Sequence, residues 1–241
     1  MAKVSAGSFD LNKLFHGGYD KDIVSVLYGG PGSGKTNFVL LAAVSQARKG
    51  NRVIFIDTEG GFSTERVKQL VGEKGNYKDV LHNIVLLKPT SFEEQKKAFS
   101  DLNKYLKNHV SLIVVDGMTI LYRLDFADAR EKGREKSESG KWRADDGVQT
   151  INSELAKQMK TLAEIARKKE IPVLVTNQIY RWEDEDKMVG GDILKYWGKC
   201  LIELENDKGR RTVKLKKHRS LPEASMQFQI YDGGIRKRGW I

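Results

Sequence analysis

The sequence predicts an α/β domain built on a mostly parallel sheet with helices on both faces. Short, predominantly apolar runs alternate with amphipathic segments through residues 23–176, and a glycine-rich loop follows the first run. Such apolar runs are typical of strands buried on both faces, which occur where helices cover a parallel sheet. After Lys199 the apolar runs alternate with polar residues, which predicts strands with one face in solvent.

Each element of this pattern can be placed on the chain. Strands are expected at residues 23–28, 53–57, 84–87, 112–116 and 173–176, where apolar residues predominate. Helices are expected at residues 35–49, after a cap at Ser63 or Thr64, at residues 92–106 and at residues 148–169. Because strands and helices alternate, the strands should run parallel.

The last part of the chain lacks helical spacing. Strands are expected at residues 201–205, 212–216 and 226–230, with a turn at residues 207–209. Because short turns join antiparallel strands, these strands should extend the sheet at one edge, partly in antiparallel order.

Two polar segments interrupt the pattern. Residues 123–146 carry many charges and few apolar side chains, which predicts a mobile loop or a loosely held helix. Residues 179–191 follow the carboxyl end of an expected strand directly.

Length and composition indicate one intracellular domain. The chain has 241 residues, of which 39% are hydrophobic, so we expect a single domain over residues 1–241. Cys200 is the only cysteine, which excludes a disulfide within the chain. The sequence contains neither a signal peptide nor a run of about 18 apolar residues that could span a membrane. We therefore expect a cytoplasmic protein with no membrane partner.

The charge is strongly positive and unevenly placed. The formal net charge is +10, and residues 208–241 hold ten Lys or Arg side chains against Glu223 and Asp232. A basic stretch of this kind favours a polyanionic partner such as nucleic acid. The alternative is a solvated basic edge that keeps strands from aggregating.

A glycine-rich loop of the form G-x-x-x-x-G-K-[ST] follows the first expected strand. It comprises Gly29, Gly30, Pro31, Gly32, Ser33, Gly34, Lys35 and Thr36, with Asn37 directly after it. Glycines let backbone N–H groups close around phosphates, and the helix that starts here adds positive potential. Lys35 supplies charge to the β- and γ-phosphates, and Thr36 offers its hydroxyl to Mg²⁺. The loop predicts a site for a nucleoside triphosphate with Mg²⁺.

Three further side chains stand at the carboxyl ends of expected strands, where ligands bind in open α/β sheets. Asp116 is a candidate second anchor for Mg²⁺, and its alternative role is a helix cap. Glu59 is a candidate for orienting or deprotonating a water molecule, unless it is a solvated turn residue. Gln178 could contact the γ-phosphate or could be purely structural.

Several segments taken together carry a family resemblance. They are residues 5–8 with 14–18, residues 55–62 with Glu65 and Arg66, residues 120–123, residues 175–178, and Gly190-Gly191 with residues 221–223. In this order they resemble the RecA/RadA recombinase family, and most closely its archaeal RadB branch. The resemblance covers nearly the whole chain and implies a RecA-like P-loop NTPase core that binds ATP and Mg²⁺.

The resemblance also implies roles for particular residues. Glu59 would be the catalytic glutamate, acting with Lys35, and Gln178 would couple the γ-phosphate to a DNA-binding loop. Residues 123–146 and 179–190 match the family's two DNA-binding loops, with candidate contacts at Arg123, Arg130, Lys132, Arg134, Lys141, Trp142, Arg143 and Arg181. Lys217 and Arg219 match a basic pair that reaches a neighbouring subunit's nucleotide. Their alternative role is that of basic residues at the rim of a strand.

Two departures from the family pattern shape the expected function. The core begins almost at Met1, where full-length recombinases have an N-terminal helical domain, and the second loop is acidic at residues 183–186. Both favour an ATP-regulated, DNA-binding accessory recombinase with weak ATPase activity and without efficient strand exchange. The alternatives are a strand-exchange recombinase with DNA-stimulated ATPase activity and a KaiC-like regulatory ATPase that does not act on DNA.

The partners implied by the resemblance are single-stranded or duplex DNA and other recombination proteins. A full-length recombinase is one candidate, and further copies of the chain are another.

Overall fold

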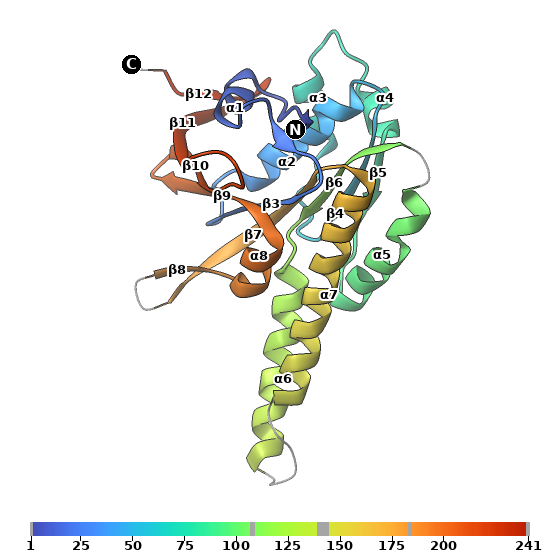
Figure 1. Ribbon diagram of the computed structural model, residues 1–241, viewed down its shortest axis with the longest axis vertical. Coiled ribbons are helices and arrows are strands. Elements are labelled where there is room, and N and C mark those ends of the chain that lie inside the picture. Colours follow the sequence, from blue (N-terminus) through green and yellow to red (C-terminus); the bar gives the residue numbers. More distant parts are fainter. Residues whose placement is uncertain (1, 107–108, 139–144, 183–184, 240–241) are drawn as a thin grey trace.

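A ten-stranded sheet forms the centre of the part that the computed structural model describes, residues 2–106, 109–138, 145–182 and 185–239 (Figure 1). The strands are β1 (Lys3–Val4), β2 (Tyr19–Asp20), β3 (Val24–Gly29), β4 (Arg52–Asp57), β5 (Ile84–Leu87), β6 (Val110–Asp116), β7 (Val173–Trp182), β8 (Glu185–Met188), β9 (Gly198–Asp207), β10 (Arg210–Lys217), β11 (Ala224–Tyr231) and β12 (Gly234–Lys237). The helices are α1 (Phe9–Leu14), α2 (Lys35–Ala47), α3 (Thr64–Val71), α4 (Tyr77–His82), α5 (Phe92–Tyr105), α6 (Ile120–Glu138), α7 (Asp145–Lys169) and α8 (Gly191–Trp197).

The strand order places the first strand of the core in the middle of the sheet. The order is β12-β11-β10-β9-β3-β7-β6-β4-β5, and β8 pairs with β7 outside this path. Strands β3, β4, β5, β6, β7 and β9 run parallel, whereas β10, β11 and β12 are antiparallel to their neighbours. The expected fold class, a mostly parallel sheet with an antiparallel C-terminal edge, is confirmed.

Helices bury both faces of the sheet. One face packs against α1, α2, α3 and α4 in a core that contains Leu11, Phe38, Phe55 and Leu70. The other face packs against α5, α7 and α8 and contains Ile56, Phe99, Leu155 and Leu194. Strands β4, β6 and β7 contribute alternate residues to the two cores, which explains why their central residues, 53–56, 112–115 and 173–175, are all apolar.

For residues 123–146 the structure favours the helical alternative over the loop in the part of the segment that it describes. Residues 120–138 form a regular helix, α6, which lies against α7, and the two project together from the body of the molecule (Figure 1). Glu, Lys, Arg and Ala favour helix even where few apolar residues are present. The buried side chains of Leu121 and Tyr122 anchor the start of α6 to the core.

The segment after the fifth expected strand also differs from the prediction. Strand β7 continues to Trp182 and forms an antiparallel hairpin with β8, in which Ile179 lies opposite Met188. Because β8 supplies hydrogen-bond partners, β7 remains a strand after it leaves the sheet. The short elements α1, α4, β1, β2 and β12 were not predicted.

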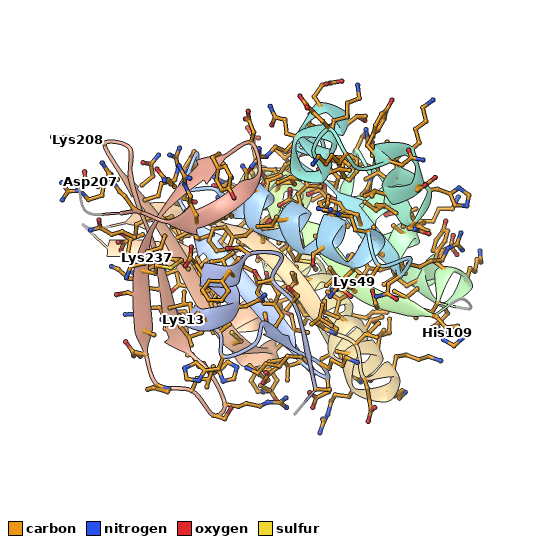
Figure 2. The ribbon with its side chains drawn as sticks, turned by 90° about the horizontal axis from the view of Figure 1, so that it is seen from above. Lys13, Lys49, His109, Asp207, Lys208 and Lys237 are labelled. Atoms are coloured by element: carbon orange, nitrogen blue, oxygen red, sulfur yellow. The ribbon has the colours of Figure 1, made fainter. Side chains whose placement is uncertain are left out.

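The basic C-terminal strands form one edge of the molecule. Figure 2 shows Asp207 and Lys208 at the β9–β10 turn, with Lys237 and Lys13 on the same side and Lys49 and His109 on the other. Some of the cations here are paired, since Lys214 contacts Glu205, and Lys216 lies 3.8 Å from Glu223. None of the helices in the described ranges has the length and apolarity required to cross a bilayer.

Candidate nucleotide site

Four predicted site residues meet where the parallel strands end. Lys35 starts α2 directly after β3 and its loop, Glu59 follows β4, Asp116 ends β6, and Gln178 lies in β7. These strands are neighbours in the sheet, so their carboxyl ends share one edge. The sheet therefore brings together residues that are up to 143 positions apart in sequence.

The phosphate-binding loop depends on its glycines. Gly32 and Gly34 have φ values of 69° and 107°, which residues with a side chain rarely adopt. A Cβ on Gly34 would also lie 3.1 Å from the Ile230 side chain of β11. The amide of Asn206, at the end of β9, donates to the Gly32 carbonyl at 3.2 Å. The loop is thus held in shape by the C-terminal strands as well as by its own sequence.

Lys35 is a buried cation that faces neutral groups. Its Nζ donates to the carbonyls of Gly29 and Gly30 at 2.9 and 3.0 Å and lies 3.4 Å from Gln178 Oε1. Burial lowers the pKa of Lys35, while the charges of Glu59 and Asp116 oppose this shift. Since no carboxylate among the described residues bonds directly to Lys35, its buried ammonium group is well suited to an incoming phosphate.

Asp116 and Thr36 fit a magnesium ion. Asp116 is fully buried, and its Oδ1 accepts a hydrogen bond from the Thr176 hydroxyl at 2.6 Å. Within the described residues, no hydrogen bond of normal geometry reaches Oδ2. A Cβ on Gly61 would come within 3.3 Å of Thr36 Oγ1 and 3.4 Å of Asp116 Oδ2, so a small space between these oxygens is kept free. Hydroxyl and carboxylate oxygens are ligands that Mg²⁺ prefers, often through water.

The environment of Asp116 disfavours its ionised form. Burial raises the pKa of Asp116 to about 6, the hydrogen bond from Thr176 opposes this, and the charges of Glu59 and Asp57 add to it. Because the native state holds this proton more tightly than the unfolded chain, stability falls as pH rises from about 4 to 6 and is level above that.

Asp116→Asn should therefore stabilise the protein free of nucleotide and Mg²⁺ at pH 7.5. The neutral amide removes a buried charge and can still accept from Thr176, so we expect a gain of about 2–3 kcal/mol. Thermal unfolding from pH 4 to 8 measures the difference, which should shrink below pH 6. A variant that is less stable than the wild type at pH 7.5 contradicts this account of the site.

Glu59 and Gln178 form a hydrogen-bonded pair beside Lys35. Gln178 Nε2 donates to Glu59 Oε1 at 3.3 Å, and the same amide contacts Lys35 through its oxygen. Glu59 lies over Gly117, where a Cβ would come within 2.5 Å of the Glu59 side chain. Glu59 itself is exposed, so water can reach its carboxylate. A carboxylate in this position can orient or deprotonate a water molecule next to a γ-phosphate.

The sequence analysis gave no role to several residues that hold this site. Asp57 accepts hydrogen bonds from the backbone N–H groups of Gly61 and Phe62, both at 3.0 Å, and so fixes the loop that carries Glu59. Arg66 binds the Asn37 side chain at 2.9 Å and the Tyr231 carbonyl at 2.9 Å. The role of Thr176 could have been predicted from the sequence, because this residue stands two positions before Gln178 and so faces the same side of β7. The Arg66 contact joins residues too distant in sequence to be predicted.

The candidate DNA contacts within the described residues belong to two hairpins, the helical hairpin of α6 and α7 and the strand hairpin of β7 and β8. Arg123 and Arg130 are exposed on α6. The backbones of Lys132 and Arg134 belong to α6 and that of Arg181 to β7, while Lys141, Trp142 and Arg143 lie outside the described residues. The two hairpins leave the sheet at the edge that holds the nucleotide site, since α6 follows β6 and β8 follows β7.

Lys217 and Arg219 lie at the opposite end of the sheet from the phosphate-binding loop. Lys217 Nζ donates to the carbonyl of Gly198, which pairs with the first residue of β3, at 3.2 Å. Arg219 is bound by the carboxylates of Asp20 and Asp22 at 2.7–3.0 Å. Neither side chain can therefore act on a nucleotide bound by its own chain.

The fold and the site together define a RecA-like P-loop ATPase core. A family model described as Rad51 matches residues 1–238. The chain belongs to the Rad51 family, and comparison with curated proteins assigns it to the archaeal RadB branch, as the sequence motifs predicted.

Individual relatives match over nearly their full length. The DNA repair and recombination protein RadB of Methanobrevibacter smithii is 39% identical, over 93% of this chain and 92% of the relative. RadB of Methanocaldococcus jannaschii is 36% identical, over 93% of this chain and 98% of the relative. A crystal structure of the RadB recombinase is similar in fold, with a TM-score of 0.78 and 30% identity, over 98% of this chain and 100% of that one.

Proposed function

We propose that this protein is an ATP-regulated, DNA-binding accessory recombinase of DNA repair and homologous recombination. In this role nucleotide occupancy changes its affinity for DNA, and ATP hydrolysis is slow. The observation that carries the proposal is that Asp116 and Gln178, at the nucleotide site, belong to the strands from which the two hairpins extend. The recombination and repair names of its relatives support the biological setting.

The residues of this chain have separate tasks in the proposed ATPase reaction. Backbone N–H groups of residues 29–34, other than Pro31, which has none, hold the phosphates, and Lys35 moves its donors from the loop carbonyls to the β- and γ-phosphate oxygens. Thr36 and Asp116 would hold Mg²⁺, which neutralises charge on the phosphates. Glu59 aligns the attacking water and accepts its proton, while Gln178 Nε2 exchanges its contact with Glu59 for a hydrogen bond to a γ-phosphate oxygen.

Slow hydrolysis is supported by the charge of the second hairpin. Residues 183–186 are all acidic, so this hairpin should be repelled by DNA phosphates. If DNA engages mainly α6, it gains little contact with the hairpin next to Gln178, and stimulation of hydrolysis should be small. Strong stimulation by DNA would instead support the strand-exchange recombinase.

Two basic residues favour association with further copies of the chain. Lys217 and Arg219 lie at the end of the sheet remote from their own nucleotide, which is the geometry required to contact the nucleotide of a neighbour. Arg219 would first have to leave Asp20 and Asp22. A full-length recombinase is another candidate for this neighbour.

DNA binding should be electrostatic and should depend on α6. We expect log K to fall with log[salt] at about 0.7 per phosphate contact for single strands and about 0.9 for duplex. Replacing Arg123 and Arg130 together by alanine should weaken DNA binding. It should also reduce the salt slope by the amount that corresponds to about one to two phosphate contacts. Anisotropy of a labelled oligonucleotide from 50 to 300 mM salt, about the usual working range, measures both quantities.

Lys74→Ala provides the matched control for this experiment. Lys74 is an exposed cation between α3 and α4, at the end of the molecule remote from the tip of α6 (Figure 1). Its removal should leave the slope unchanged. Absence of binding at low salt, or an affinity that does not depend on salt, would rule out a function through DNA.

A further inference from the structure

A buried cluster of uncharged polar side chains lies between the nucleotide site and the two hairpins. It consists of Gln95, Thr119, Gln158 and Asn177, each at most 2% exposed. Polar side chains are costly to bury unless hydrogen bonds hold them. The partners of these four side chains identify the segment that the cluster holds.

A pair of hydrogen-bonded glutamines contacts the β6–α6 turn on the side of the helices. Gln95, on α5, donates through Nε2 to the Met118 carbonyl at 3.1 Å and to Gln158 Oε1, on α7, at 2.8 Å. Met118 lies two residues after Asp116, between β6 and α6. Helix α5 is therefore bonded to the turn that leads from the candidate magnesium ligand into α6, and α7 is bonded to α5 at the same point.

Thr119 and Asn177 hold the same turn from the sheet side. The Thr119 hydroxyl donates to Asn177 Oδ1, and Asn177 Nδ2 donates to the Val189 carbonyl at 2.9 Å. Val189 directly follows β8, and its backbone N–H donates to the Gln178 carbonyl at 3.2 Å. Asn177 thus joins the start of the α6–α7 hairpin to the end of the β7–β8 hairpin.

Strand β7 connects the hydrogen bonds of Asn177 to the nucleotide site. Because side chains alternate along a strand, Thr176 and Gln178 face the nucleotide site while Asn177 faces the helices. The Thr176 hydroxyl donates to Asp116 Oδ1 at 2.6 Å and accepts from the Gly117 N–H at 2.7 Å. A displacement of Asp116 or Gln178 on nucleotide binding therefore moves the groups that Asn177 holds.

We propose that Thr119 and Asn177 are positioning residues that make the two hairpins respond to the nucleotide. The proposal rests on the proposed function, in which nucleotide occupancy changes DNA affinity. Closely packed interiors move between discrete arrangements and do not deform continuously. Since Asn177 is fully buried, a shift of β7 either breaks its hydrogen bonds or carries both hairpin bases with it. The hydrogen bonds of Asn177 thus favour the second outcome, in which a shift of β7 moves the bases of both hairpins.

The Thr119 hydroxyl can be removed with little change in shape. Thr119→Val removes the hydrogen-bond donor to Asn177, while Thr119→Ser retains it. Thr161→Val is the matched control, because the Thr161 hydroxyl donates only within α7, to the Lys157 carbonyl at 2.9 Å. The quantity measured is the ratio of the dissociation constants of a labelled oligo-dT with ADP and with a non-hydrolysable ATP analogue, at fixed salt.

We expect Thr119→Val to move this ratio toward one by about threefold or more. Affinity for the ATP analogue without DNA should stay within about twofold of wild type, since Thr119 does not line the nucleotide site. Thr119→Ser and Thr161→Val should keep the wild-type ratio.

The outcomes separate this inference from the function on which it rests. A wild-type ratio of one overturns the nucleotide switch and the positioning role together. A wild-type ratio different from one that Thr119→Val leaves unchanged overturns the positioning role alone. If Thr119→Val does not unfold in one cooperative transition, Thr119→Ala, which also removes the donor to Asn177, replaces it with the same expected loss.

Discussion

Lys35→Ala should abolish measurable ATP turnover and weaken ATP binding by about 100-fold or more. Removing one partner of a buried, hydrogen-bonded charge pair typically costs about 2–5 kcal/mol, and in the bound state Lys35 would form such pairs with two phosphates. Without nucleotide, Lys35→Ala should change the free energy of unfolding only slightly. Burial lowers the pKa of Lys35, so the cation is not fully compensated by the carbonyls of Gly29 and Gly30.

Thermal unfolding with and without Mg²⁺-ATP measures this effect. At 100 times the dissociation constant a ligand stabilises by about 2.7 kcal/mol, which raises the Tm of a protein of this size by about 5–10 °C. The wild type and Lys49→Ala, which alters an exposed lysine just after α2, should show this rise, whereas Lys35→Ala should not. Equal stabilisation of Lys35→Ala would show that ATP does not bind at the P-loop.

Glu59→Gln should keep ATP binding and lose hydrolysis. General acid–base catalysis by a positioned side chain contributes about 10²–10⁴-fold, and an amide cannot accept the proton of the attacking water. The variant retains a group that can pair with Gln178, so the geometry beside Lys35 should persist. Single-turnover hydrolysis of labelled ATP, with affinity measured in parallel, separates the chemical step from binding.

Glu65→Gln is the control for this variant. Glu65 is an exposed glutamate at the start of α3, and its carboxylate pairs with Lys68 at 2.6 Å. It should hydrolyse ATP at the wild-type rate. Turnover by Glu59→Gln at the wild-type rate would remove Glu59 from the reaction. Loss of binding as well would indicate that its carboxylate shapes the site and does not act in the chemical step.

The sequence predicted most of the sheet because the buried strands are apolar on both faces. β3, β4, β5 and β6 are mostly apolar along their length, and helix α2 begins at the predicted lysine. The prediction was weakest where polar residues adopt regular structure. Residues 123–146 contain few apolar side chains, yet α6 extends to Glu138 because its first turns are anchored in the core and its composition favours helix.

The sequence by itself determined the family and the candidate nucleotide residues, since both depend on local patterns such as residues 29–36 and 55–62. Only the tertiary structure showed what holds those residues and what joins them to the hairpins. The contact of Arg66 with Tyr231 and that of Thr119 with Asn177 link residues far apart in sequence. No local pattern specifies such pairs, because they exist only once the order of strands in the sheet has brought the segments together.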